Sequence, residues 1–214
     1  MSSFALKFLA IVLMTIDHVG LLLFPTHRIL RAIGRLAFPI FAFQIGVGFK
    51  HTHSKEKYIL RMILFTLISQ YPFTLFLNAV KIAPILNIGA TFTLALLALY
   101  SIDKFKKSWV KYPILVIIAC IATYVPMDYG IFGVLIVISL YFLDYSKVIG
   151  MSSFFSIVLM HCAIDKSIFS LPALLALFPI LLYNGKKGPN IKYLFYVFYP
   201  LHMLILLLIK DFVL

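Results

Sequence analysis

Long apolar stretches, separated by short polar or basic segments, follow one another along almost the whole chain. A helix needs about 20 apolar residues to cross the hydrocarbon core of a bilayer, so these stretches predict transmembrane helices. The pattern predicts an all-α fold, a polytopic membrane helix bundle with about nine transmembrane helices (roughly 8–10, because the shorter stretches also suit re-entrant segments). The predicted spans are Phe4–Phe24, Ile29–Phe49, Tyr58–Ala79, Thr91–Ile102, Tyr112–Val125, Tyr129–Leu143, Val148–Ala163, Leu171–Tyr183 and Tyr193–Ile209.

The composition supports a single integral membrane domain over residues 1–214. Hydrophobic residues make up 63% of the chain, charged residues only 12%, and the mean hydropathy is +1.06. Soluble domains are roughly 45–50% apolar, so little length is left for one here. The net charge of +12 would suggest a nucleic-acid partner in a soluble protein. In a membrane protein it is explained first by the Lys and Arg bias of cytoplasmic loops, and we expect no nucleic-acid partner.

The Lys and Arg residues divide unevenly when alternate loops are assigned to opposite sides of the membrane. The side that holds the N-terminus collects thirteen of the 19 Lys and Arg residues, and the other side collects six. Because the richer side is expected to be cytoplasmic, the N-terminus is predicted inside and the C-terminus outside. Arg28, Arg31 and Arg35 then lie on the side that charge bias disfavours, so they need another explanation.

Two ionisable residues stand in the middle of the first apolar stretch, in "LMTIDHVGLLLFP". The turn to the second span is short, so the two helices are expected to be antiparallel neighbours. Folding the chain at Thr26 sets Asp17 level with Arg35, and this predicts an ion pair that offsets the cost of burying Asp17. His18 points about 100° away from Asp17, so we expect its partner on another helix or in a polar cavity. A general base is one interpretation of His18, and a packing hydrogen bond is the other.

Other polar side chains lie at similar depth. His202 follows Pro200 in the last span, which suggests either a cavity at a bent helix or a packing kink. His161 and Asp165 are four residues apart on one helix face, and the simplest interpretation is an interfacial hydrogen-bonded pair. Asp128 is able to cap the next helix, to accept a proton or to pair with an outer arginine, and the sequence does not choose among these.

The basic segment "KHTHSKEK" has two interpretations. It contains Lys50 and Lys57 and is followed by Arg61. Such a segment suits anionic lipid headgroups, and it also suits the phosphates of a cofactor. Metal binding is not expected, because His51 and His53 lack zinc-site spacing and the two cysteines, Cys120 and Cys162, lie in apolar runs. Walker, GxGxxG, HExxH and GxSxG motifs are absent, which argues against nucleotide hydrolysis and metalloprotease chemistry.

The chain resembles the TraX family, the membrane acetylases associated with conjugative pilin maturation, and more distantly other integral-membrane acyltransferases. The resemblance is carried, in order, by "LKFLAIVLMTIDHVG", "RAIGRLAFPIFAFQIGVGFKHT", "KYILRMILFTLISQYPF", "ATFTLALLALY", "MDYGIFGVL", "LLYNGKKG" and "KYLFYVFYPLHMLIL". Two positions differ from the family pattern: Gln70 stands where an acidic residue is frequent, and Thr74 where Asp is usual.

The resemblance implies acetyl transfer from acetyl-CoA, as co-substrate, in the cytoplasmic membrane of a bacterium. The implied acceptor is an amine or hydroxyl of a membrane-associated peptide, a pilin or a surface glycan. Its catalytic candidates are His18, Asp17, Arg35, Arg31, Asp128 and His202. The candidates for binding the cofactor are Lys50, Lys57, Arg61, Lys186, Lys187 and Tyr199. The alternative is a small transporter or proton-coupled channel that uses the intramembrane Asp, His and Arg residues; a non-catalytic scaffold would leave those residues unexplained.

Overall fold

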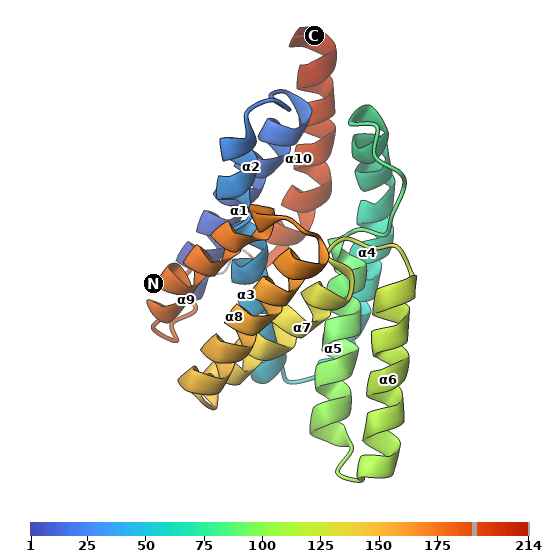
Figure 1. Ribbon diagram of the computed structural model, residues 1–214, viewed down its shortest axis with the longest axis vertical. Coiled ribbons are helices and arrows are strands. Elements are labelled where there is room, and N and C mark those ends of the chain that lie inside the picture. Colours follow the sequence, from blue (N-terminus) through green and yellow to red (C-terminus); the bar gives the residue numbers. More distant parts are fainter. Residues whose placement is uncertain (190–191, 214) are drawn as a thin grey trace.

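The computed structural model describes residues 1–189 and 192–213, and in these ranges the fold is a bundle of helices (Figure 1). The helices are α1 (Ser3–Leu22), α2 (Arg28–Gly34), α3 (Ala37–His51), α4 (Lys55–Ala79), α5 (Ile88–Lys104), α6 (Ser108–Tyr124), α7 (Gly130–Tyr141), η1 (Phe142–Asp144), α8 (Lys147–Ile164), η2 (Ile168–Ala176), α9 (Leu177–Leu181) and α10 (Lys192–Val213). Leu86 and Met127 form an isolated β-bridge between two loops. The predicted all-α membrane bundle is confirmed.

The spans that the apolar pattern predicts correspond to these helices, with two differences. Within the described residues, five helical segments are long and apolar enough to cross a membrane, and they are Ser3–Leu22, Arg28–His51, Lys55–Ala79, Lys147–Ile164 and Tyr193–Phe212. The second span is interrupted between α2 and α3, at Arg35 and Leu36. The eighth is a 3₁₀-helix that contains Pro172 and continues into the short α9. Proline lacks the N–H that a regular helix needs, which accounts for the tighter turn.

Serine and asparagine side chains begin several of the helices. The Ser2 hydroxyl accepts a hydrogen bond from the Ala5 amide at the start of α1, and Ser54 and Ser146 do the same for α4 and α8. The Asn87 side chain accepts from Gly89 at the start of α5. These caps satisfy amides that have no partner within the helix, so the ends of the helices follow from the local sequence.

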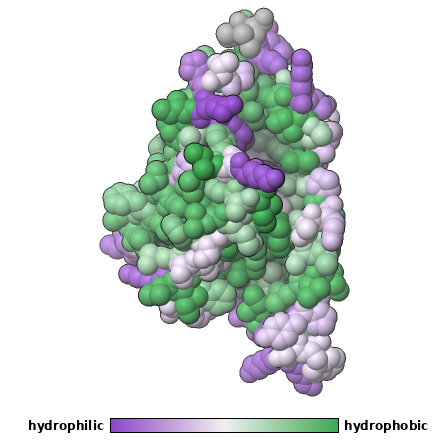
Figure 2. Space-filling view, in the orientation of Figure 1, coloured by the Kyte–Doolittle hydropathy of each residue, from purple (hydrophilic) through white to green (hydrophobic). Residues whose placement is uncertain are grey.

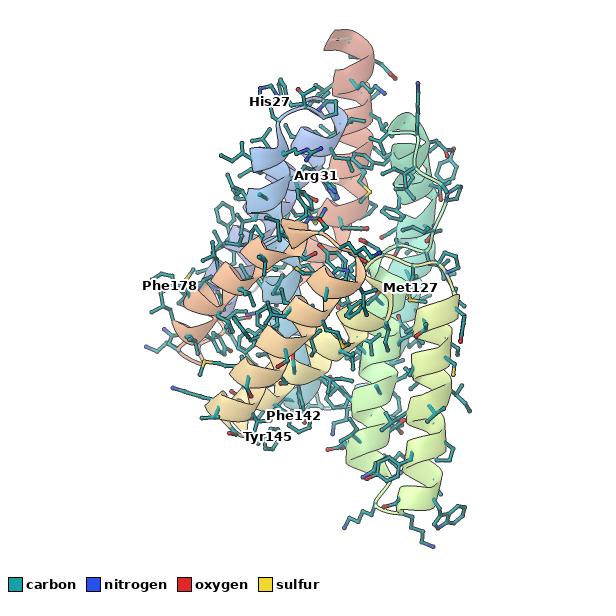
Figure 3. All side chains as sticks on the ribbon, viewed as in Figure 1. His27, Arg31, Met127, Phe142, Tyr145 and Phe178 are labelled. Atoms are coloured by element: carbon teal, nitrogen blue, oxygen red, sulfur yellow. The ribbon has the colours of Figure 1, made fainter. Side chains whose placement is uncertain are left out.

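The basic loops that were assigned to one side by charge meet at one end of the bundle. Lys50, at the end of α3, forms an ion pair with Asp144 at 2.8 Å, and Lys55, at the start of α4, pairs with Asp103 of α5. The Ser3 amide donates to the carbonyl of Lys186 at 2.8 Å, which joins the start of α1 to the segment before α10. In Figure 3, Phe142 and Tyr145 mark this end and His27 lies at the opposite end. The relative arrangement predicted from charge is therefore present.

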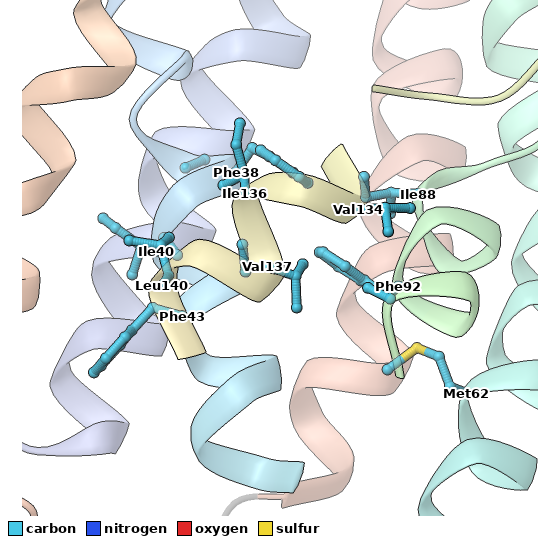
Figure 4. Close-up of a cluster of buried hydrophobic side chains, with 14 of the residues drawn as sticks. Phe38, Ile40, Phe43, Met62, Ile88, Phe92, Val134, Ile136, Val137 and Leu140 are labelled. Carbon is cyan, nitrogen blue, oxygen red and sulfur yellow. The ribbon is translucent and has the colours of Figure 1, made fainter. Parts of the chain in front are cut away.

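The core lies between α3, α5 and α7, where Phe38, Ile40, Phe92, Val137 and Leu140 are buried (Figure 4). Hydrophobic side chains also cover most of the outer face in Figure 2, and hydrophilic ones gather toward its upper part and its lower end. This is the distribution of a protein whose middle faces lipid and whose ends face water.

Candidate functional site

A cavity of about 480 Å³ extends through the bundle among α1, α3, α4 and α10. At the basic end it is lined by Lys7, His51, Arg61 and Lys187, and toward the other end by Asp17, His18, Arg31, Arg35, Asp128 and Tyr129. Between these two groups its walls are mainly apolar, with residues such as Ile11, Met14, Phe41, Met62 and Phe65. The cavity therefore joins a basic group of side chains at one end to a cluster of acidic, basic and histidine side chains at the other.

His18 has a partner on another helix, as the sequence predicts. Its Nδ1 lies 2.7 Å from Nε2 of His202, on α10. Nδ1 of His202 lies 2.9 Å from the carbonyl oxygen of Phe198, which only accepts, so this nitrogen carries the proton. With both rings neutral, Nε2 of His202 must accept from Nδ1–H of His18. The lone pair of His18 is thereby left on Nε2.

His202 stands behind His18, because it is not among the side chains that line the cavity. It is 4% exposed, and its ring stacks with that of Phe198 at a centroid distance of 5.0 Å. The ring of His18 also lies 5.0 Å from that of Phe76. These contacts hold both imidazoles in place. His202 does not itself line the cavity, and it is connected to the cavity only by its hydrogen bond to His18.

The predicted pairing of Asp17 with Arg35 is wrong. Asp17 Oδ2 accepts from Nη1 of Arg31 at 3.0 Å. Gly34 packs directly on Asp17, at a position where a Cβ would collide with the carboxylate side chain. Gly34 is the residue level with Asp17. Arg31 lies about one turn before Gly34, nearer the loop between α1 and α2, and its long side chain reaches back to the carboxylate. The hairpin arithmetic placed the helices one residue out of register.

Arg35 turns toward a different partner because it lies at the break between α2 and α3. Its Nη1 donates to the hydroxyl of Tyr129 at 3.3 Å, and its guanidinium lies 4.9 Å from the centre of the Phe169 ring. Arg31 lies 6.0 Å from the same ring. One aromatic side chain thus supports both guanidinium groups, an arrangement in which cation–π attraction contributes.

The "MDYG" turn carries Asp128 and Tyr129 to the cavity. Asp128 donates its amide to Leu86 at 2.9 Å, and its carbonyl accepts from the Thr91 hydroxyl. Tyr129 has a positive φ of 61° and its ring stacks on Phe38 at 3.8 Å. Tyr129, and not Asp128, is the N-cap of α7, and no side-chain capping bond is formed there. The capping interpretation of Asp128 is therefore wrong. Asp128 does line the same cavity as Arg31 and Arg35, as the third interpretation, pairing with an outer arginine, requires.

The candidates for cofactor binding divide into two groups. Arg61, Lys187 and Tyr199 line the cavity, and Tyr199 is buried. Lys50, Lys57 and Lys186 lie at the same end but not in the cavity wall, and Lys50 is paired with Asp144.

Two basic residues at the mouth, Lys7 and His51, were not predicted. Lys7 is the one charged residue of the apolar sequence around it, about one turn into α1, and this was the available signal for it. His51 belongs to the basic segment "KHTHSKEK", and no further feature of the sequence singles it out. Among the residues described here, no group of three or more His, Cys, Asp or Glu side chains is arranged to hold a metal ion.

Several buried polar atoms of the cavity residues have no hydrogen-bond partner within the described chain. They are Asp17 Oδ1, Arg35 Nε, Gln44 Nε2 and Arg61 Nε, and Ser69 Oγ, away from the cavity, is the fifth such atom. Buried polar groups are normally paired, because an unmade hydrogen bond costs about 1–3 kcal/mol. Four of these five atoms belong to residues that line the cavity, so the cavity offers hydrogen-bonding groups to a molecule that enters it.

Comparison with known proteins gives consistent results. The family described as "TraX protein" matches residues 2–210. A probable fimbrial assembly protein, FimC of serogroup H1 from Dichelobacter nodosus, is 29% identical over 235 aligned positions, which cover 99% of this chain and 96% of that protein. An uncharacterized protein of Rickettsia prowazekii (strain Madrid E) is 46% identical over 65 residues, covering 30% of this chain and 24% of that protein. No solved structure matches. The chain belongs to the TraX family.

Proposed function

We propose that this protein is an integral membrane acetyltransferase. It moves an acetyl group from acetyl-CoA to an amine or a hydroxyl of an acceptor at the membrane or its outer face. The observation that carries the proposal is the cavity that joins the basic mouth at Lys7, Arg61 and Lys187 to His18. Along the cavity the basic residues come first, then the apolar walls, and then His18. This order suits coenzyme A, whose phosphates lie at one end of the molecule and whose thiol lies at the other.

The residues present fit coenzyme A. Lys and Arg bind phosphates as point charges or forked donors, and Arg61 has a buried Nε without a partner in the described chain. Lys7 and His18 are separated by eleven residues of α1, which corresponds to about 16 Å along the helix axis. An elongated pantetheine arm is suited to such a distance, and the apolar walls beside Met14, Phe41 and Met62 suit its chain. When bound, acetyl-CoA would supply a thioester carbonyl as the electrophile.

His18 is the proposed general base. Its Nε2 takes the proton of the acceptor nitrogen or oxygen as that atom forms a bond with the acetyl carbon. The carbon–sulfur bond then breaks, and His18 returns the proton to the sulfur, which leaves as the thiol. The products are the acetylated acceptor and free coenzyme A. His202 is a positioning residue in this scheme, because its accepting Nε2 fixes the tautomer of His18.

Arg35 is the proposed donor to the oxygen on which negative charge develops. Arg31 is engaged with Asp17, whereas Arg35 retains an Nε–H without a partner among the described residues. A positioned donor of this kind is worth about 2.7–4 kcal/mol of transition-state stabilisation. This gives the outer arginines a role that charge bias does not provide.

The relative from Dichelobacter nodosus carries the name of a fimbrial assembly protein. That name supports a pilin or another membrane-associated peptide as acceptor, and a surface glycan is the hydroxyl-bearing alternative. The proposed location is the cytoplasmic membrane of a bacterium, with the lipid bilayer around the apolar middle, the N-terminus inside and the C-terminus outside. The concentration of basic loops at one end supports that orientation.

Acetyl-CoA binding to the detergent-purified protein tests the proposal by isothermal calorimetry. Arg61→Gln should weaken binding at least tenfold, as expected for loss of one charge-assisted contact of about 1.4 kcal/mol or more. Lys57→Gln is the matched control, since it lies at the same end outside the cavity, and should leave the affinity unchanged. No binding to the unaltered protein would refute the acetyltransferase proposal.

A transporter or proton-coupled channel is the second candidate. It is favoured by the fact that Arg31, Arg35, Asp128 and Tyr129 line a further cavity on their other side, so that polar groups continue toward the opposite end. Proteoliposomes loaded with a pH-sensitive dye distinguish the two. Proton flux that requires Asp17 and is independent of acetyl-CoA would support transport over acetyl transfer.

A further inference from the structure

A second cavity, of about 340 Å³, lies beyond the polar cluster. It is lined by Arg31, Arg35, Asp128, Tyr129, His161, Asp165, Ser167, Phe169 and Ser170. We call it the outer cavity. Its first four residues also line the main cavity, so they form a shared wall between the two. A group that enters the outer cavity therefore meets the same arginines that border His18.

The mouth of the outer cavity lies where α8 ends and η2 begins. Asp165 and Ser167 are exposed there, whereas Phe169 and Ser170 are half-buried. The Ser167 hydroxyl caps η2 by accepting from the Phe169 amide. This cap fixes the segment that places the Phe169 ring beneath the two guanidinium groups. The cavity is thus built by structured residues and is open to the surface.

His161 and Asp165 form an ion-pair geometry at this mouth, with Nε2 and Oδ2 separated by 3.0 Å. The side chain of His161 is 19% exposed and that of Asp165 is 52% exposed. His161 is further held against Phe132, with a centroid distance of 4.5 Å. The imidazole therefore orients a carboxylate at the end of α8 that is itself half-exposed.

The charges around the shared wall are unequal. Three carboxylates, those of Asp17, Asp128 and Asp165, face two guanidinium groups, those of Arg31 and Arg35. Counting these carboxylates and guanidinium groups alone, the cluster carries one net negative charge, which a single incoming cation would neutralise. An anionic ligand would add to the imbalance.

We propose that the outer cavity is the docking site of the acceptor, and that Asp165, oriented by His161, is the counter-ion of an ammonium group on that acceptor. The proposal rests on the proposed acetyl transfer and adds to it the entry route and the residues that select the acceptor. Asp165 and His161 are positioning residues, because they hold the acceptor at the far side of the arginine wall from the basic mouth. The ammonium group loses a proton to water at the open mouth before it reaches His18 as a neutral amine.

The first experiment measures the electrostatic character of the outer cavity without any activity. In a Cys120→Ser, Cys162→Ala background, Ser170→Cys is treated with a cationic and an anionic methanethiosulfonate of similar size. The ratio of the cationic to the anionic rate should exceed that for Thr26→Cys, on the exposed connection at the same end, and Asp165→Asn should lower it about tenfold. Equal ratios at the two positions, or no effect of Asp165→Asn, would overturn the proposal.

The second experiment measures transfer to a short peptide with a free amino terminus, and to the same peptide with a hydroxyl in its place. Asp165→Asn should raise KM for the amine about tenfold, the loss of one charge-assisted contact, while kcat and the affinity for acetyl-CoA stay within about twofold. Asp103→Asn, which removes an exposed carboxylate at the opposite end, is the matched control and should change neither. An unchanged KM, or an equal rise in KM for the hydroxyl peptide, would refute an ammonium site.

The two proposals fail in different ways. If the unaltered protein does not bind acetyl-CoA, the acetyltransferase proposal fails, while the labelling ratios still decide whether the outer cavity favours cations. If the protein binds acetyl-CoA and transfers acetyl groups but the labelling ratios are equal, only the docking site is refuted.

Discussion

The Asp17–Arg31 ion pair allows a double-mutant cycle that tests the register of the first hairpin. The two side chains are 15% and 21% exposed, so both charges are largely removed from water. Asp17→Asn removes the carboxylate that accepts from Arg31, and Arg31→Gln removes the guanidinium that donates to the Asp17 carboxylate. Breaking a buried pair costs about 3–5 kcal/mol, and the residual exposure here places the expected loss for each single variant at about 2–3 kcal/mol.

The double variant Asp17→Asn/Arg31→Gln leaves neither charge unpaired, so its loss of stability should be smaller than the sum of the two single losses. Contacting residues of one ion pair show coupling energies of about 0.5–3 kcal/mol, and we expect about 2 kcal/mol here. The assay follows the helical circular dichroism of each purified variant during heating in detergent, with the free energy of unfolding obtained from reversible transitions.

A second cycle with Arg35→Gln provides the control. Arg35 donates to Tyr129 and not to Asp17, so its coupling to Asp17→Asn lacks the direct hydrogen bond and should be smaller than that measured for Arg31. Additive losses in the Asp17/Arg31 cycle would mean that these side chains do not touch. A larger coupling for Arg35 would show that the carboxylate pairs as the simple hairpin arithmetic predicts and would refute the register observed here.

Three further predictions follow from the site. His18→Gln should lower the rate of acetyl transfer by about 10²–10⁴ while the protein still binds acetyl-CoA in calorimetry, and near-normal turnover would exclude a general base at this position. His202→Phe, which fills the same space but cannot accept a hydrogen bond, should lower kcat more than tenfold at unchanged acetyl-CoA affinity, and an unchanged kcat would exclude the positioning role. In a cysteine-free background, Lys57→Cys should react with impermeant thiol reagents only from the cytoplasmic side and Thr26→Cys only from outside; labelling of Lys57→Cys from outside would invert the orientation.

Much of the architecture was predictable because it depends on properties that act over whole segments. Apolar length predicts the spans, and loop charge predicts which connections meet at one end. Serine and asparagine at Ser2, Ser54 and Asn87 mark helix starts through local hydrogen bonds. The 3₁₀ geometry of η2 was not predictable in the same way. Pro172 signals a departure from a regular helix, but the form that the departure takes depends on packing against α8 and α3.

The sequence allows one to predict which residues form the candidate site, but not which of these residues contact each other. Asp17, His18 and the arginines stand out because ionisable groups at membrane depth are costly. Which arginine meets Asp17 depends on a shift of one residue, set by the close contact at Gly34. Similarly, that His202 lies behind His18 depends on the rotation of α10 about its axis. Helix rotation and register are set by tertiary packing, and a hydropathy pattern carries little information about either.

Arg31 and Arg35 have different partners, which suits the first to a structural role and the second to a role in the proposed reaction. Arg31 meets a carboxylate at 3.0 Å, and a guanidinium in a close ion pair is held in place by that pair. Arg35 meets only a neutral hydroxyl at 3.3 Å and retains an N–H without a partner in the described chain. A guanidinium that is not hydrogen-bonded to a carboxylate keeps an N–H for another acceptor, so it is the better placed of the two to donate to an oxygen on which negative charge develops. The one-residue register that gives Asp17 to Arg31 therefore leaves Arg35 available to the cavity. The same shift that made the hairpin prediction wrong is what makes Arg35 the better oxyanion donor.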